Sequence, residues 1–142
     1  MKKNLLMIVA AGLVLASCNK KGCTDVNASN YSEEATKDNG ECTYESTVTF
    51  WYNQQTSIQK EQAGVTDFKV YVGEVLAVTH PVETYEVIAP DCGDVAKITV
   101  TKNLNKLTEK SYTWQFKDQN DNPVFSGTWE AVGGGCDIIQ VQ

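Results

Sequence analysis

The sequence predicts an all-β protein, an Ig-like or transthyretin-like β-sandwich of about seven strands. Three observations predict this fold class. From residue 46 onward, short segments alternate between apolar and polar residues, which is the period of a half-buried strand. Turn-forming residues separate these segments at regular intervals, and no helical period lies between them. The length of 142 residues suits one such domain, which we place at 46–142.

The alternation indicates where each strand lies. The alternating segments are 47–52, 68–72, 75–79, 84–88, 97–101, 112–116, 125–129 and 138–141, and the pattern is weakest at 84–88. Gly73-Glu74 predicts a tight two-residue turn with glycine first. The polar segment 53–64 has no strand period and predicts a long loop or a short helix. Long loops on a rigid sandwich often carry binding residues.

The charge composition excludes several classes of function. All 12 basic residues are lysines, 18 residues are acidic, and the net charge is −6. Such a chain offers little to neutralise phosphates, so nucleic acid is not an expected partner. His80 is the only histidine, and no nucleophile motif accompanies it. We therefore expect no catalytic residues and no cofactor, and a hydrolase using paired carboxylates is a distant alternative.

The first residues have the pattern of a signal peptide. Lys2 and Lys3 precede an apolar run from Leu5 to Leu15, which is too short to span a bilayer. The ending Leu-Ala-Ser-Cys18 resembles a bacterial lipobox. That resemblance implies removal of residues 1–17 and attachment of acyl chains such as palmitate to Cys18, so the membrane becomes a partner through a stable lipid anchor. Asn19 in place of Asp favours the outer membrane, with its periplasmic and external faces as alternatives.

The remaining cysteines predict disulfides. With Cys18 set aside, four are left, an even number in an exported chain. Three pairings are possible. The local one, Cys23–Cys42 with Cys92–Cys136, fits best because each pair falls inside its own segment.

The segment Gly22-Cys23-Thr24-Asp25, continuing to Cys42-Thr43-Tyr44, resembles a short cysteine-bracketed module of exported bacterial proteins. The resemblance implies no defined activity, and we place the lipidated cysteine, a tether and this module at 18–45. Asp25 and Asp38 are weak candidates for calcium ligands. Calcium needs six to eight oxygens, and Asp38-Asn39-Gly40 is only a fragment of a calcium loop. We therefore expect Asx turns here and no metal site.

The body resembles small sandwich domains of exported bacterial lipoproteins. The residues that carry this likeness are Phe50-Trp51, Pro90-Asp91-Cys92-Gly93, the segment 125–129 and Gly134-Gly135-Cys136. The likeness implies the sandwich fold and a disulfide, and no activity.

Trp51 is the one candidate for a ligand-binding residue. It alternates with Phe50 and Tyr52 and precedes the polar segment 53–64. An outward Trp51 would offer a stacking platform for a sugar ring or an apolar partner side chain, whereas an inward one would belong to the core. We expect a non-catalytic binding or structural domain with an envelope protein or glycan partner, and a carbohydrate-binding module is the alternative.

Overall fold

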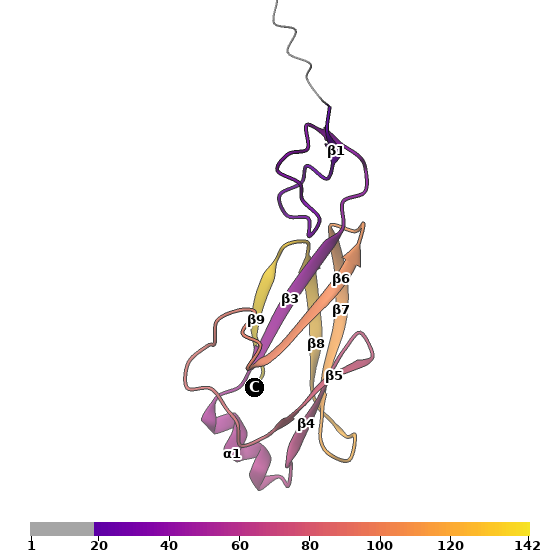
Figure 1. The fold of residues 1–142 in the computed structure, drawn as a ribbon. Coiled ribbons are helices and arrows are strands. Elements are labelled where there is room, and N and C mark those ends of the chain that lie inside the picture. The colour runs from indigo at the N-terminus through magenta and orange to yellow at the C-terminus, as the bar shows by residue number, and fades with distance from the viewer. Residues whose placement is uncertain (1–18) are drawn as a thin grey trace, which may run out of the picture.

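The computed structural model describes residues 19–142, and its body is a two-layer β-sandwich (Figure 1). One layer is a three-stranded sheet in the order β6-β3-β9, and the other is a four-stranded sheet in the order β5-β4-β7-β8. The prediction of an all-β sandwich of about seven strands is confirmed. The predicted signal peptide and the predicted lipidation site at Cys18 lie outside the described residues.

Each of the seven sandwich strands overlaps one of the alternating segments. They are β3 (Tyr44–Trp51), β4 (Asp67–Val72), β5 (Val75–Pro81), β6 (Ile98–Asn105), β7 (Glu109–Lys117), β8 (Pro123–Val132) and β9 (Cys136–Gln140). Neighbouring strands are antiparallel except β3 and β9, which are parallel. Strand β3 therefore occupies the centre of its sheet, between β6 and β9.

The core lies between the two sheets and is rich in aromatic rings. Phe50 on β3 contacts Trp114 and Phe116 on β7, with ring centroids 5.3 and 5.5 Å apart. Tyr52 meets Phe68 of β4 edge to face at 5.2 Å. These residues all come from the inward-facing positions of their alternating segments, and each is buried. Such tilted and edge-to-face pairs add to the stability gained from apolar burial.

The predicted weak strand at 84–88 is wrong. Strand β5 belongs to the four-stranded sheet and β6 to the three-stranded sheet, so the chain between them must cross from one layer to the other. Residues 82–97, which we call the crossover loop, make that passage without strand structure. Residues 84–88 form no ladder with either sheet, and the amide of Glu86 bonds only to the carbonyl of Tyr52, just beyond the end of β3.

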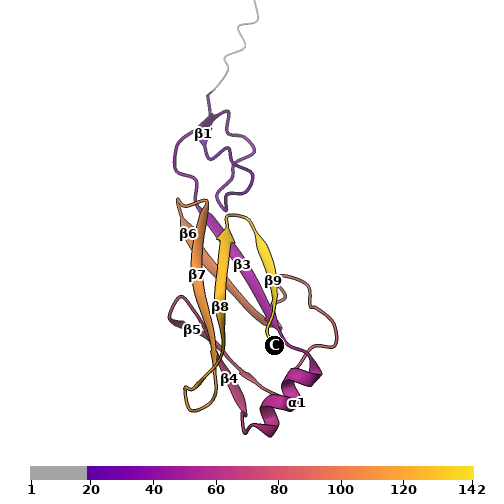
Figure 2. The same cartoon turned by 180° about the vertical axis from the view of Figure 1, so that it is seen from behind.

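The polar segment 53–64 forms the helix α1 (Gln54–Gln62), the second of the two predicted alternatives. Asn53 caps it, because its Oδ1 accepts a 2.9 Å hydrogen bond from the amide of Thr56. The buried Ser57 hydroxyl donates to the carbonyl of Val82 at 2.8 Å. Much of this segment is thus explained by folding, since the helix closes one end of the sandwich (Figure 2).

The turn between β4 and β5 has the predicted length of two residues. Gly73 and Glu74 have φ of +61° and +65°, so both occupy the left-handed region. Two left-handed residues form a type I′ turn, whose twist matches that of the flanking strands. Glycine makes the first position easy, and Glu74 adopts the second despite its side chain.

The cysteine-bracketed module forms a small separate knot at the end of the sandwich opposite α1 (Figure 1). It contains the short parallel pair β1 (Lys21–Gly22) and β2 (Lys37–Asp38). Strand β3 begins at Tyr44, two residues after the closing Cys42. Within residues 19–142, no helix has the length and apolar character needed to cross a bilayer.

Candidate binding surfaces

Both predicted disulfides are present. Cys23 bonds to Cys42 within the module, and Cys92 bonds to Cys136 within the sandwich. The second bond joins the crossover loop to the first residue of β9. Each bond therefore fixes a loop that has little regular secondary structure of its own.

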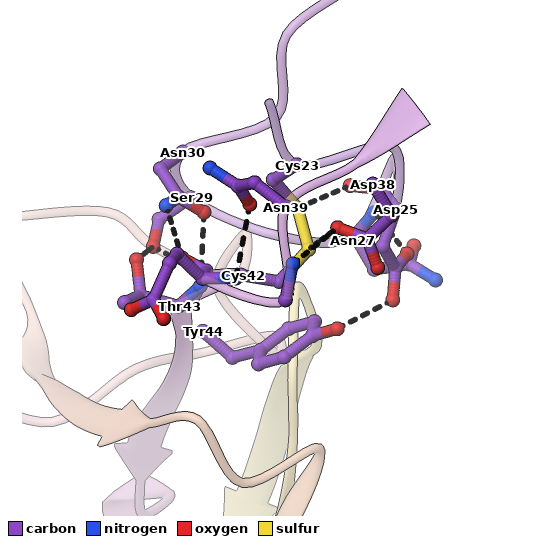
Figure 3. The surroundings of a disulfide bond; sticks show 12 residues. Cys23, Asp25, Asn27, Ser29, Asn30, Asp38, Asn39, Cys42, Thr43 and Tyr44 are labelled. Atoms are coloured by element: carbon purple, nitrogen blue, oxygen red, sulfur yellow. Dashed lines mark hydrogen bonds between the residues drawn. A yellow bond between two sulfur atoms is a disulfide. The ribbon is translucent and has the colours of Figure 1, made fainter. Parts of the chain in front are cut away.

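The two calcium candidates serve the module as turn residues (Figure 3). Oδ1 of Asp25 accepts a 2.9 Å hydrogen bond from the amide of Asn27, and Oδ1 of Asp38 accepts one of 3.1 Å from Gly40. Oδ2 of Asp25 accepts a further bond of 2.7 Å from the Tyr44 hydroxyl. Within 19–142, no three His, Cys, Asp or Glu side chains gather as metal ligands would.

Trp51 faces outward from the three-stranded sheet and is half-buried. The buried residues next to it, Phe50 and Tyr52, take the core positions, so Trp51 is neither core nor fully exposed. Two positions earlier on the same face, Thr49 is completely buried. Its Oγ1 accepts a 3.0 Å hydrogen bond from the amide of Gly93. The crossover loop therefore covers part of the face from which Trp51 projects.

The crossover loop is held to the sandwich on both sides of residues 87–91. The amide of Glu86 donates to the carbonyl of Tyr52 at 3.0 Å, and its carboxylate pairs with Lys97 at 2.6 Å. The hydrogen bond from Lys97 to Glu86 raises the pKa of the lysine. Cys92 provides the second attachment through its disulfide. Between these points, Val87 and Ile88 are 85% and 77% exposed.

A second candidate surface is a depression on the outer face of the four-stranded sheet, with a volume of about 320 Å³. Tyr71 lies in it, and we call it the Tyr71 depression. Its lining residues are Tyr71, Glu74, Thr113, Gln115 and Lys117. The ammonium of Lys117 lies 4.7 Å from the centre of the Tyr71 ring, within cation–π range. One aromatic ring is thus surrounded by a carboxylate, a hydroxyl, an amide and an ammonium group.

The Tyr71 depression was not predicted from the sequence, although a signal for it was present. Tyr71 alternates with the buried Val70 and Val72, so its outward position follows from the period of the strand. What the sequence does not contain is the order of the strands. Thr113 and Gln115 line the same depression only because β7 pairs with β4, an arrangement between segments far apart in the chain.

His80 has a structural environment. Its Nε2 lies 2.8 Å from the carbonyl oxygen of Thr84, so that nitrogen carries the proton and donates it to the hydrogen bond. The imidazole also meets the Tyr52 ring edge to face at 6.0 Å. These contacts tie the end of β5 to the start of the crossover loop.

Comparison with known proteins gives no relative. No family model, no curated protein and no solved structure matches the chain.

Proposed function

We propose that the protein is a lipid-anchored, non-catalytic binding protein of the bacterial outer membrane. The anchor rests on the sequence of residues 1–18, with its apolar run and its Leu-Ala-Ser-Cys18 ending. The two disulfides support an exported chain, because such bonds persist in oxidising compartments. The sandwich is then the binding domain, with an envelope protein or a glycan as its partner.

The observation that carries the proposal is the placement of the module. Residue 19 enters the knot at one end of the molecule, and α1 lies at the other end (Figures 1 and 2). A chain anchored at Cys18 would therefore hold the module nearest the membrane. The helix and the base of the crossover loop would then lie on the membrane-distal side, where a partner has access.

Contacts between the module and the sandwich support a fixed presentation. The Tyr44 hydroxyl bonds to Asp25 at 2.7 Å, and Lys106, in the turn after β6, pairs with Glu41 of the module at 2.7 Å. The Gly134 α-carbon lies close to the backbone of Asn27, where an added Cβ would be 2.8 Å from the Asn27 oxygen. A knot packed in this way acts as a stiff spacer between anchor and sandwich.

The anchoring test uses the full chain with Cys18→Ala. We expect the native protein in the outer-membrane fraction of a density gradient, with an acylated amino terminus by intact mass, and the variant in the soluble fraction. Ser17→Ala is the matched control, because it keeps a small residue before Cys18 and should leave the protein membrane-bound. A native protein that is soluble and unmodified would contradict the proposal.

Carbohydrate binding is the second candidate function. The Tyr71 depression is a better site for a sugar than the surface around Trp51. Sugar rings stack on aromatic faces, and their hydroxyl groups need the mixture of donors and acceptors that Glu74, Thr113 and Gln115 supply. Trp51 has less to offer, because the crossover loop covers part of its face of the sheet.

An array of neutral glycans tests whether the Tyr71 depression binds carbohydrate. If the depression binds sugar, Tyr71→Ala should abolish a signal that the wild-type protein gives, and Thr79→Ala on the neighbouring edge strand should retain it. If wild type and Tyr71→Ala give the same signal, the carbohydrate function at this site is ruled out.

A further inference from the structure

The crossover loop carries two adjacent aliphatic side chains that contribute nothing to the core. Val87 is 85% exposed and Ile88 is 77% exposed, whereas Val82, where the loop leaves β5, is 2% exposed. Val82 packs the loop against the sandwich, so Val87 and Ile88 are not needed for that purpose. Exposing adjacent aliphatic side chains to water is unfavourable, and such residues commonly mark contact surfaces.

The exposure of these two side chains is built into the fold. On one side of them, Glu86 is fixed by the hydrogen bond from its backbone amide to the carbonyl of Tyr52 and by its ion pair with Lys97. On the other side Cys92 is covalently bound to Cys136. Only five residues, 87–91, lie between these two attachments. The entropy cost of ordering the loop is thus met during folding, which favours later binding.

The charge around the pair decides between kinds of partner. The crossover loop contains four acidic residues, Glu83, Glu86, Asp91 and Asp94, against the single Lys97. Its net charge of −3 disfavours an anionic lipid surface, which attracts basic segments. The same charge disfavours a second copy of the chain, since two acidic loops would repel each other. An apolar pocket with lysines and arginines at its rim complements both the aliphatic pair and the charge.

We propose that Val87 and Ile88 form a docking tip for a partner protein, which receives them in an apolar pocket rimmed by basic side chains. The exposed aliphatic side chains supply the buried contact, and the acidic residues of the loop steer and orient the encounter. This inference requires the folded sandwich only. It is independent of the lipid anchor and of the Tyr71 depression.

The test places a photo-crosslinking amino acid at position 87 of the full chain in its native envelope. The matched control carries it at Val75, which is 59% exposed in the β4–β5 hairpin. We expect a discrete protein adduct from position 87 and none from position 75. Peptide mapping should locate the crosslink in an apolar pocket flanked by Lys or Arg.

The partner identified by the crosslink is then purified and titrated against variants of this protein. Val87→Ser/Ile88→Ser should weaken binding at least tenfold, because each buried aliphatic side chain contributes about one decade or more. Its melting temperature should match that of wild type, since both side chains are exposed in the folded state. Glu83→Gln/Asp91→Asn should reduce the dependence of affinity on salt concentration.

Several outcomes would overturn the proposal. One is that position 87 gives no adduct. Another is that its adduct is with lipid, glycan or a second copy of the chain. A third is that positions 87 and 75 give equal adducts. An affinity that is unchanged in Val87→Ser/Ile88→Ser would overturn it as well. Failure of the Cys18→Ala experiment would leave this result unaffected, so the two proposals are tested separately.

Discussion

The hydroxyl of Tyr44 donates a 2.7 Å hydrogen bond to Oδ2 of Asp25 and so connects the first residue of β3 to the cysteine-bracketed module (Figure 3). The ring of Tyr44 is buried, and Cys42 lies two residues before it in the disulfide of the module. One side chain therefore belongs to both parts of the molecule. This pair is one of the contacts that orient the module on the sandwich, together with the packing of Gly134 against Asn27.

The first prediction concerns the titration of this pair. The hydrogen bond from the Tyr44 hydroxyl and, second, the hydrogen bond from the backbone amide of Asn27 hold the pKa of the Asp25 carboxyl below its ordinary value. A lowered acid pKa stabilises the folded state above the unfolded pKa, and this contribution is lost as pH falls through the lower folded pKa. In Tyr44→Phe, the Asp25 pKa should rise toward the ordinary value of an aspartate in an NMR titration. An unchanged pKa would contradict the assigned cause.

The second prediction concerns the disulfide of the crossover loop. The Cys92→Ser/Cys136→Ser variant opens a loop with a sequence separation of 44 and should lower the free energy of unfolding by about 4 kcal/mol. Removal of Cys23–Cys42, with a separation of 19, should cost about 3 kcal/mol. Urea titrations of the two double variants measure both values. A loss below about 1 kcal/mol for the first variant would mean that the crossover loop is held by its other contacts.

The third prediction distinguishes Trp51 from its neighbour. Phe50 is fully buried, so Phe50→Ala should cost about 3–5 kcal/mol by leaving a cavity. Trp51 is half-buried on the outer face, and Trp51→Ala should cost less than about 2 kcal/mol. Thermal melts of the two variants provide the comparison. Equal losses would place Trp51 energetically in the core and exclude it as a binding platform.

The fourth prediction concerns a glycine inside a strand. Gly127 on β8 lies opposite Trp114 on β7, and an added Cβ would be 2.4 Å from Cζ2 of the indole. Gly127→Ala should therefore force Trp114 to move and cost about 1–3 kcal/mol. Ser126→Ala, at an exposed position of the same strand, is the control and should change stability little. If both variants unfold at the same urea concentration, the indole does not lie against Gly127.

Sequence patterns predicted those parts of the fold that depend on local alternation. Phe68, Val70 and Val72 point inward because a strand places every second side chain on one face, and that period is visible in the sequence. The pattern failed at 84–88 for a physical reason. Val87 and Ile88 are as apolar as a strand residue, but pairing requires a neighbouring strand, and the position of neighbours is a tertiary property.

The candidate sites were harder to predict than the strands, because they depend more on tertiary arrangement. The cysteine pairing followed from chain organisation, because each pair lies within one segment. The choice of Trp51 followed from its alternation with Phe50 and Tyr52, which left its orientation open, and it did not include the crossover loop that covers its sheet face. The Tyr71 depression joins β4 to β7, and nothing in the local sequence of either strand indicates that they pair.

The parallel pairing of β3 with β9 has a consequence for the folding of a chain that emerges into its compartment with the amino terminus first. The amide of Val141, just beyond β9, bonds to the carbonyl of Trp51 at 2.9 Å, so the two ends of the sandwich sequence meet in one sheet. All other strands of the sandwich lie between them in the chain. An emerging polypeptide cannot complete the sheet around β3 until β9 has emerged, and such non-local topologies fold slowly. The apolar residues of β3 must therefore stay shielded from aggregation until the last strand arrives.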